Sequence, residues 1–194
     1  MKVVSVWLAL MLCASPLAAA HDLDLTTAQV TLRGERHIAI RVEADVAKLA
    51  GRLDWPDKPS TLLDMGGASD DQLAALRGAI EAQFTTGMPV QVGGREIQSQ
   101  RVRPVDLNLL RRKIQSAIAY QILPKGHAHR DDDQDRRRYI IIHVDGFISP
   151  AADDRNLQID FPAALGRISV TYNRPRTQTL AAGDVQTRYL EHLD

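Results

Sequence analysis

The stretch 138–172 constrains the fold more than any other part of this sequence, because three successive segments in it alternate apolar and polar residues. The segments are 139–148, 156–161 and 167–172. A period of two is typical of strands that bury one face. The links between the segments are short and rich in turn formers, which predicts an antiparallel meander. The residues expected on the buried faces are Ile140, Ile142, Val144 and Ile148, then Leu157, Ile159 and Phe161, then Ile168, Val170 and Tyr172.

Other segments with the same alternation predict six more strands. Segments 28–33 and 37–44 flank a short turn and indicate a hairpin. A second hairpin is predicted where 88–92 and 95–98 flank Gly93-Gly94, a dipeptide typical of tight turns. Two short strands are expected near 177–180 and 185–189.

Helical spacing is clearest between residues 70 and 85. Ser69 and Gln72 have the spacing of a capping box, and the apolar residues that follow recur every three or four positions. The expected packing face consists of Leu73, Leu76, Ile80 and Phe84, and Gly87 is expected to end the helix in a left-handed conformation. A shorter helix is predicted over 45–53, and 60–67 is expected to be a loop.

The segment 109–123 fits two structures. Ile114, Ser116, Ile118, Tyr120 and Ile122 alternate as in a strand. A helix that starts after Asp106 would place Leu107, Leu110, Ile114 and Ile118 on one face. We favour a strand over 113–123, because its alternation is longer and Pro124 closes it.

Together these elements predict a mainly β fold, an antiparallel β-sandwich of about nine strands with one main amphipathic helix packed on it. The 194 residues, 44% of them apolar, suit one domain. We place it at 21–194, after a signal peptide at 1–20, with a charged loop at 125–138.

The first twenty residues have the pattern of a cleaved export signal. Lys2 precedes an apolar run, and the segment ends in an Ala-x-Ala sequence at Ala20. We therefore expect a periplasmic protein, and cleavage removes Cys13, the only cysteine. We expect no transmembrane segment in the mature chain, because no later segment approaches about 20 consecutive apolar residues. The formal net charge of zero argues against a nucleic-acid partner.

Three stretches resemble the extracytoplasmic domain that precedes the membrane helices of HupE/UreJ-like proteins. They are Ala20-His21 before a strand pair, the helical segment 77–83, and the segment 170–183. The resemblance covers most of the mature chain, although this sequence has no membrane spans up to Asp194. It implies a β-sandwich that senses, binds or assembles at the cell envelope near metal transport. It implies no catalytic residue, and transport itself would belong to the family's membrane segment.

Histidines are the candidate metal ligands. After cleavage His21 is the first residue, where its α-amine and imidazole could together chelate copper or nickel. His127 and His129 lie two apart in the charged loop, followed by three aspartates, and could share a metal. A solvated loop without a site is the alternative. His143 and Asp145 share the strand face opposite the isoleucines, where they form either a site or an ordinary cross-strand contact.

Two functions follow from this sequence. The first is a soluble, exported, non-catalytic binding module that acts on an envelope or membrane protein. It is favoured because no nucleophile elbow, zinc-protease motif or phosphate loop is present. The alternative is a periplasmic protein that handles copper or nickel through His21, His127 and His129.

Overall fold

The computed structural model describes residues 25–34, 36–122, 137–149 and 156–175. The expected signal peptide at 1–20 and the expected strands near 177–180 and 185–189 lie outside these residues, as does the charged loop up to residue 136. Within the described ranges, no helix is long and apolar enough to span a membrane.

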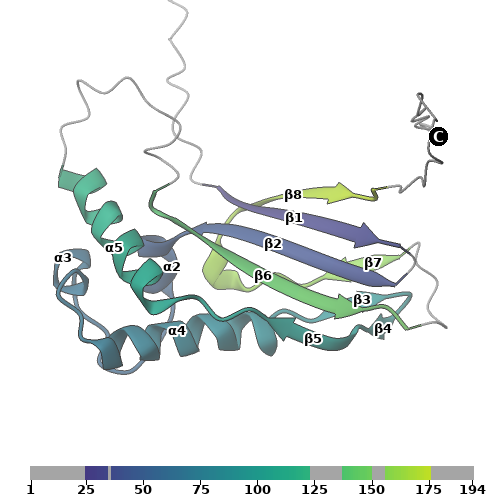
Figure 1. Cartoon of the computed structure of the whole chain (residues 1–194), viewed down its shortest axis with the longest axis horizontal. Coiled ribbons are helices and arrows are strands. Elements are labelled where there is room, and N and C mark those ends of the chain that lie inside the picture. Colours follow the sequence, from purple (N-terminus) through teal and green to yellow (C-terminus); the bar gives the residue numbers. More distant parts are fainter. Residues whose placement is uncertain (1–24, 35, 123–136, 150–155, 176–194) are drawn as a thin grey trace, which may run out of the picture.

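The larger of two sheets contains five strands, in the order β5-β6-β2-β1-β8 (Figure 1). Their bounds are Thr26–Arg33 for β1, His37–Asp45 for β2, Gln98–Val102 for β5, Tyr139–Phe147 for β6 and Ile168–Asn173 for β8. β1 and β2 form the predicted antiparallel hairpin, and β6 lies antiparallel to β2. β8 instead runs parallel to β1, so the expectation of a wholly antiparallel arrangement is wrong and this sheet is mixed.

The smaller sheet contains β3 (Val90–Val92), β4 (Arg95–Glu96) and β7 (Leu157–Ile159) in the order β4-β3-β7. β3 and β4 form the predicted second hairpin, and Gly93 and Gly94 have positive φ angles of 57° and 76°. Such angles explain the two glycines, since residues with a Cβ rarely adopt them. Ile97 then leads the chain from this sheet into β5 of the larger one.

The predicted meander is wrong, although its three strands exist. β6 pairs with β5 and β2, β7 pairs with β3 in the smaller sheet, and β8 pairs with β1. No two of the three are neighbours. The alternation identified the buried faces of the segments correctly for Ile140, Ile142 and Val144, but Tyr172 is 61% exposed. Local alternation specifies a buried face, whereas strand partners depend on contacts between distant segments.

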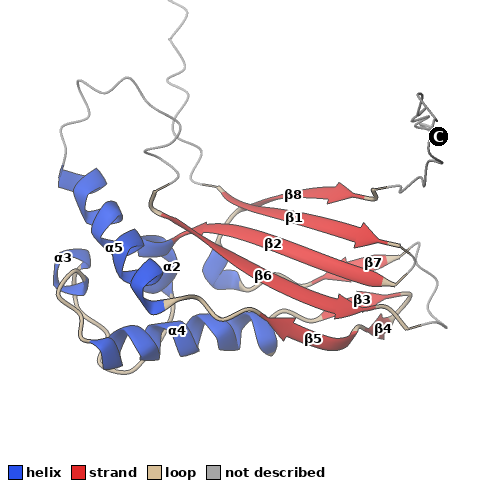
Figure 2. Ribbon diagram, viewed as in Figure 1, coloured by secondary structure: helices blue, strands red, loops and turns tan. Residues whose placement is uncertain are grey.

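The helices gather at one end of the sheets (Figure 2). They are α2 (Val46–Arg52), α3 (Leu62–Met65), α4 (Asp70–Thr85), α5 (Leu107–Ile122) and the 3-10 helix η1 (Ala163–Leu165). α4 has the predicted capping box and buries all four expected side chains. Gly87 does not end it in a left-handed conformation; instead, a Cβ there would lie 2.7 Å from the carbonyl oxygen of Gln83. α3 occupies part of the segment expected to be a loop.

The predicted strand over 113–123 is wrong, because its described residues, 113–122, belong to α5. The Oδ1 atom of Asp106 accepts a hydrogen bond from the Leu109 amide at 2.8 Å, as a helix-capping side chain does. Leu110 and Ile114 are buried, at spacings that the alternative helical interpretation required. The described residues therefore contain two long helices, α4 and α5, where one main helix was expected.

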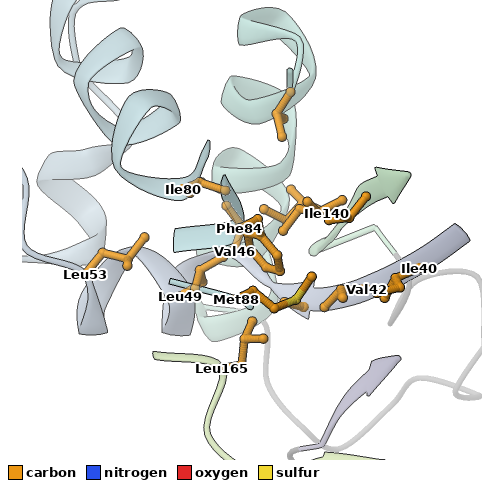
Figure 3. Close-up of a cluster of buried hydrophobic side chains, with 14 of the residues drawn as sticks. Ile40, Val42, Val46, Leu49, Leu53, Ile80, Phe84, Met88, Ile140 and Leu165 are labelled. Atoms are coloured by element: carbon orange, nitrogen blue, oxygen red, sulfur yellow. The ribbon is translucent and has the colours of Figure 1, made fainter. Parts of the chain in front are cut away.

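One hydrophobic core contains side chains from both sheets and from α2, α4 and α5. Phe84, Ile80, Val46 and Met88 meet between the helices and the strands, close to Ile140 of β6 (Figure 3). The Gln100 side chain of β5 donates to the carbonyl oxygens of Phe84 and Met88 at 2.8 and 3.0 Å, which fixes the end of α4 against the sheet. The described residues thus form eight strands in two sheets with helices packed against them, which is compatible with a mainly β fold.

Candidate functional site

Several charged side chains of the described structure gather on the face of the larger sheet opposite the core. We call it the outer face; it consists of the odd-numbered residues of β2 and β6 and the facing residues of β5. Its formation follows from the sequence, since the even-numbered residues of the same two strands are buried. The odd-numbered side chains of β2 and β6 therefore lie on the outer face, and many of them are charged or aromatic.

Asp145 lies at the centre of this face. One carboxylate oxygen is 3.5 Å from Nε2 of His37, and the other is 3.3 Å from Nε of Arg103. Asp145 of β6 thereby links β2, which contains His37, with the end of β5, which Arg103 directly follows. Asp145 thus makes a cross-strand contact with His37 of β2, the more ordinary of the alternatives expected for this face.

His143 lies on the same face in a positive environment. Its register partner on β2 is Arg41, and its carbonyl oxygen accepts from the Arg103 amide at 3.0 Å. Partial burial lowers the pKa of His143, and the charges of Arg103 and Arg41 lower it further, whereas Asp145 opposes them. His143 is therefore held toward its neutral form.

Apolar side chains continue the outer face along β6. The Phe147 and His37 rings are 5.4 Å apart between centroids and tilted by 60°, which is a favourable aromatic geometry. Phe147 is 53% exposed and Ile141 is 38% exposed. Arg41 and Glu43 add an ion pair of 3.3 Å to the neighbouring strand. The outer face thus combines arginine, aromatic and aliphatic groups held in a fixed pattern.

The chemistry available on this face is limited. His37 and Asp145 resemble an oriented base, but within the described residues no hydroxyl or thiol is hydrogen-bonded to either histidine. No group of three histidine, cysteine or acidic side chains suited to a metal ion occurs in the part of the chain that the structure describes.

Comparison with known proteins gives no relative on which to base an assignment: no family model matches the chain, and neither a curated protein nor a solved structure is similar to it. The residues themselves carry the functional argument.

A second cluster is buried at the helical end of the larger sheet. Nε of Arg138 lies 3.3 Å from Oδ2 of Asp45, with the two side chains only 7% and 9% exposed. The guanidinium stacks over the ring of Tyr120 at 4.1 Å from its centroid, and its Nη2 donates to Oη of Tyr139 at 3.3 Å. Burial by itself lowers the pKa of Arg138, but Tyr139, Asp45 and Tyr120 together raise it. Arg138 thus remains a cation inside the protein.

This cluster was missed by sequence analysis, which assigned Arg138 to the charged loop. The residue follows Arg136 and Arg137, so nothing local distinguishes it from solvated neighbours. A usable signal was Asp45, which sits where β2 ends and α2 begins and caps that helix by accepting from Ala47 at 2.9 Å. An acidic residue at such a buried junction favours a basic partner.

A narrow recess lies beside this cluster. Leu25 and Thr26 at the start of β1, Asp45 and Tyr139 line it together with residues of α2 and η1. Lys48 and Arg52 give the α2 side positive charge. Arg52 also donates to the carbonyl oxygen of Ala164 at 3.3 Å, and so connects α2 with η1.

The predicted metal ligands His21, His127 and His129 lie outside the described residues, so the structure neither brings them together nor separates them. Two described residues that follow these histidines in the sequence line one recess. Leu25, four positions after His21, and Tyr139, ten positions after His129, line the same recess.

Proposed function

We propose that this chain is an exported, periplasmic β-sandwich module that binds an envelope or membrane protein and does not catalyse a reaction. The observation that carries the proposal is the outer face, where the Asp145 carboxylate contacts both Arg103 and His37 next to the exposed ring of Phe147. Arginine and aromatic side chains are enriched in protein interfaces.

The two contacts of Asp145 give this surface an advantage as a binding site. Asp145 orients both His37 and Arg103, so these side chains have less rotational freedom to lose when a partner binds. Phe147 supplies apolar area at the end of β6. A partner of complementary shape and charge would find the contact groups already arranged.

Photo-crosslinking in the cell of origin tests this proposal. A photoreactive phenylalanine analogue at Phe147 is expected to give a discrete adduct with one envelope protein. The matched control is the same analogue at Leu63, which is 67% exposed but lies on α3 at the helical end. Arg103→Glu should abolish the adduct without changing the circular dichroism of the protein. Equal labelling from positions 147 and 63, or no adduct from either, contradicts the proposal.

A second function is supported by the recess. Copper or nickel could be held by the α-amine and imidazole of a processed His21 together with His127 and His129. Four residues reach at most about 14 Å from Leu25, and ten residues reach at most about 35 Å from Tyr139. Because Leu25 and Tyr139 line one recess, those lengths allow all three histidines to meet. One metal ion could therefore be bound by His21, His127 and His129 together.

Metal titration distinguishes the two functions. The processed protein should bind copper or nickel, an added residue before His21 should weaken binding, and His127→Ala with His129→Ala should abolish it. Since metal binding removes protons from its ligands, affinity should also rise with pH. The control is His143→Gln, which alters a described histidine of the outer face and should leave affinity unchanged. An absence of affinity in the processed protein would exclude the metal function and leave the binding module.

A further inference from the structure

The outer edge of β8 differs from every other sheet edge in the described structure. β8 pairs with β1 on one side, and within the described ranges no strand pairs with its other side (Figure 1). Its six residues, Ile168–Asn173, include no charge, no proline and no glycine, and several are β-branched or aromatic. This composition is typical of segments that add a further strand.

The other edges carry features that prevent pairing. β5 has a register irregularity between Gln98 and Arg101, and Ser99 has a φ of 54°, which bends the strand. β4 is two residues long and fully charged, and β7 is three residues long. Proteins commonly protect edges by such bulges, charges and short lengths. β8 has none of these protections along its length.

Charge at the two ends of β8 argues against a second copy of this chain as the occupant. Arg167 precedes the strand and Arg174 follows it, and both are exposed. In a symmetric antiparallel pairing of two β8 strands, Arg167 of each copy would lie opposite Arg174 of the other. Like charges directly opposite each other destabilise a strand pair.

An open polar recess next to β8 extends this positive end. Gln29, Thr31 and Arg33 of β1 line it from one side, and Asn173 and Arg174 line it from the other. Thr31 and Asn173 are register partners, so the recess lies over the paired strands β1 and β8, at the end of β8 that Arg174 follows. Arginine favours carboxylates because its planar donors match both oxygens.

We propose that β8 accepts an extended segment of a partner protein, uncharged and β-prone in its centre and acidic at both ends. The segment adds a sixth strand to the larger sheet, with one acidic side chain near Arg167 and the other near Arg33 and Arg174. Main-chain hydrogen bonds supply affinity, and the arginines select the acidic ends. The inference rests on the proposed binding role and names the chemistry of the partner.

Defined peptides test this directly with the full processed chain. The probe is a synthetic peptide of roughly ten residues with alternating valine and threonine and a glutamate near each end. A matched peptide carries lysine at both ends, and another has alternate backbone nitrogens methylated. The acidic probe should bind at least about tenfold more tightly than the lysine peptide. The methylated peptide should not bind, because it cannot complete the strand pairing.

Variants of the protein locate the site. Arg174→Glu should remove the preference for the acidic probe, whereas Arg95→Glu, an exposed change on the other sheet, should leave it unchanged. Amide signals of residues 168–173 should shift in nuclear magnetic resonance spectra when the probe is added. Failure of the acidic probe to bind, equal binding of all peptides, or shifts confined to other residues would overturn the inference. The crosslinking result at Phe147 is independent of these outcomes, so the proposed function is tested separately.

Discussion

Arg138 and Asp45 neutralise each other inside the protein, at the point where β2, α2 and β6 meet. Each comes from a different part of the chain, and the rings of Tyr120 and Tyr139 cover the guanidinium. Tyr120 lies near the end of α5, so this one cation connects α5 to the start of β6. The arrangement fixes the relative positions of the two described ends of the segment that contains His127 and His129.

Removal of the Arg138 charge should therefore be costly. We expect Arg138→Met to lower the free energy of unfolding by about 3–5 kcal/mol, because it leaves Asp45 buried without its cation. Asp45→Asn keeps a side-chain acceptor for the α2 cap, and the double variant should be less destabilised than the sum of the two changes. Urea denaturation measures all three. Arg77→Met is the control, since its exposed ion pair with Glu81 is worth little; equal effects of both arginine changes would contradict this account.

The packing face of α4 gives a second prediction. Phe84 is fully buried and lies among Ile80, Val46 and Met88 (Figure 3). Phe84→Ala should lower the free energy of unfolding by about 3–5 kcal/mol through lost burial and the cavity left behind. Leu63→Ala, at a position 67% exposed, should change it by less than about 0.5 kcal/mol. Similar midpoints for both variants in thermal or urea unfolding would show that this face of α4 is not packed.

Features carried by neighbouring residues could be predicted from the sequence. The capping box at Ser69 and Gln72, the stripe from Leu73 to Phe84 and the Gly93-Gly94 turn each depend on contacts within a few positions. Helix 107–122 was missed because its apolar residues satisfy both periodicities between Ile114 and Ile122. Asp106 decides between them, because its side chain caps the helix.

Features that depend on distant contacts could not be predicted. The parallel pairing of β1 with β8 joins segments more than 130 positions apart, and the short link before β8 wrongly favoured a meander. Arg138 becomes buried only because Asp45 and Tyr120 surround it. Asp145 was identified on the correct face, but its contacts with His37 and Arg103 require the registers of β2 and β5. The sequence therefore predicted which residues share this face, but not which of them contact each other.

A third prediction concerns Gly146 near the end of β6. A Cβ at this position would collide with Cδ1 of Ile97 and lie 3.2 Å from its Cγ1. Ile97 is the residue through which the chain passes between the two sheets, so it has little room to move. Gly146→Ala should lower the free energy of unfolding by about 1–3 kcal/mol. Ile97→Val removes the colliding methyl group and should rescue part of that loss in the double variant; additive losses would contradict the collision.

The last prediction concerns acid stability. The folded protein lowers the pKa of His143 from its ordinary value of 6.5, through partial burial first and then through Arg103 and Arg41. Below pH 6.5 the unfolded chain therefore binds a proton that the folded protein resists, and protonation favours unfolding. The destabilisation should begin as the pH falls through 6.5 and level off below the pKa of the folded state. His143→Gln removes this term, so the variant should lose less stability than the parent between about pH 7 and pH 5. Urea denaturation at a series of pH values measures the difference, with Gln29→Asn on the same face as the control. If the parent and the His143→Gln variant lose stability in parallel over this range, the neighbouring arginines do not act on His143 as the geometry indicates.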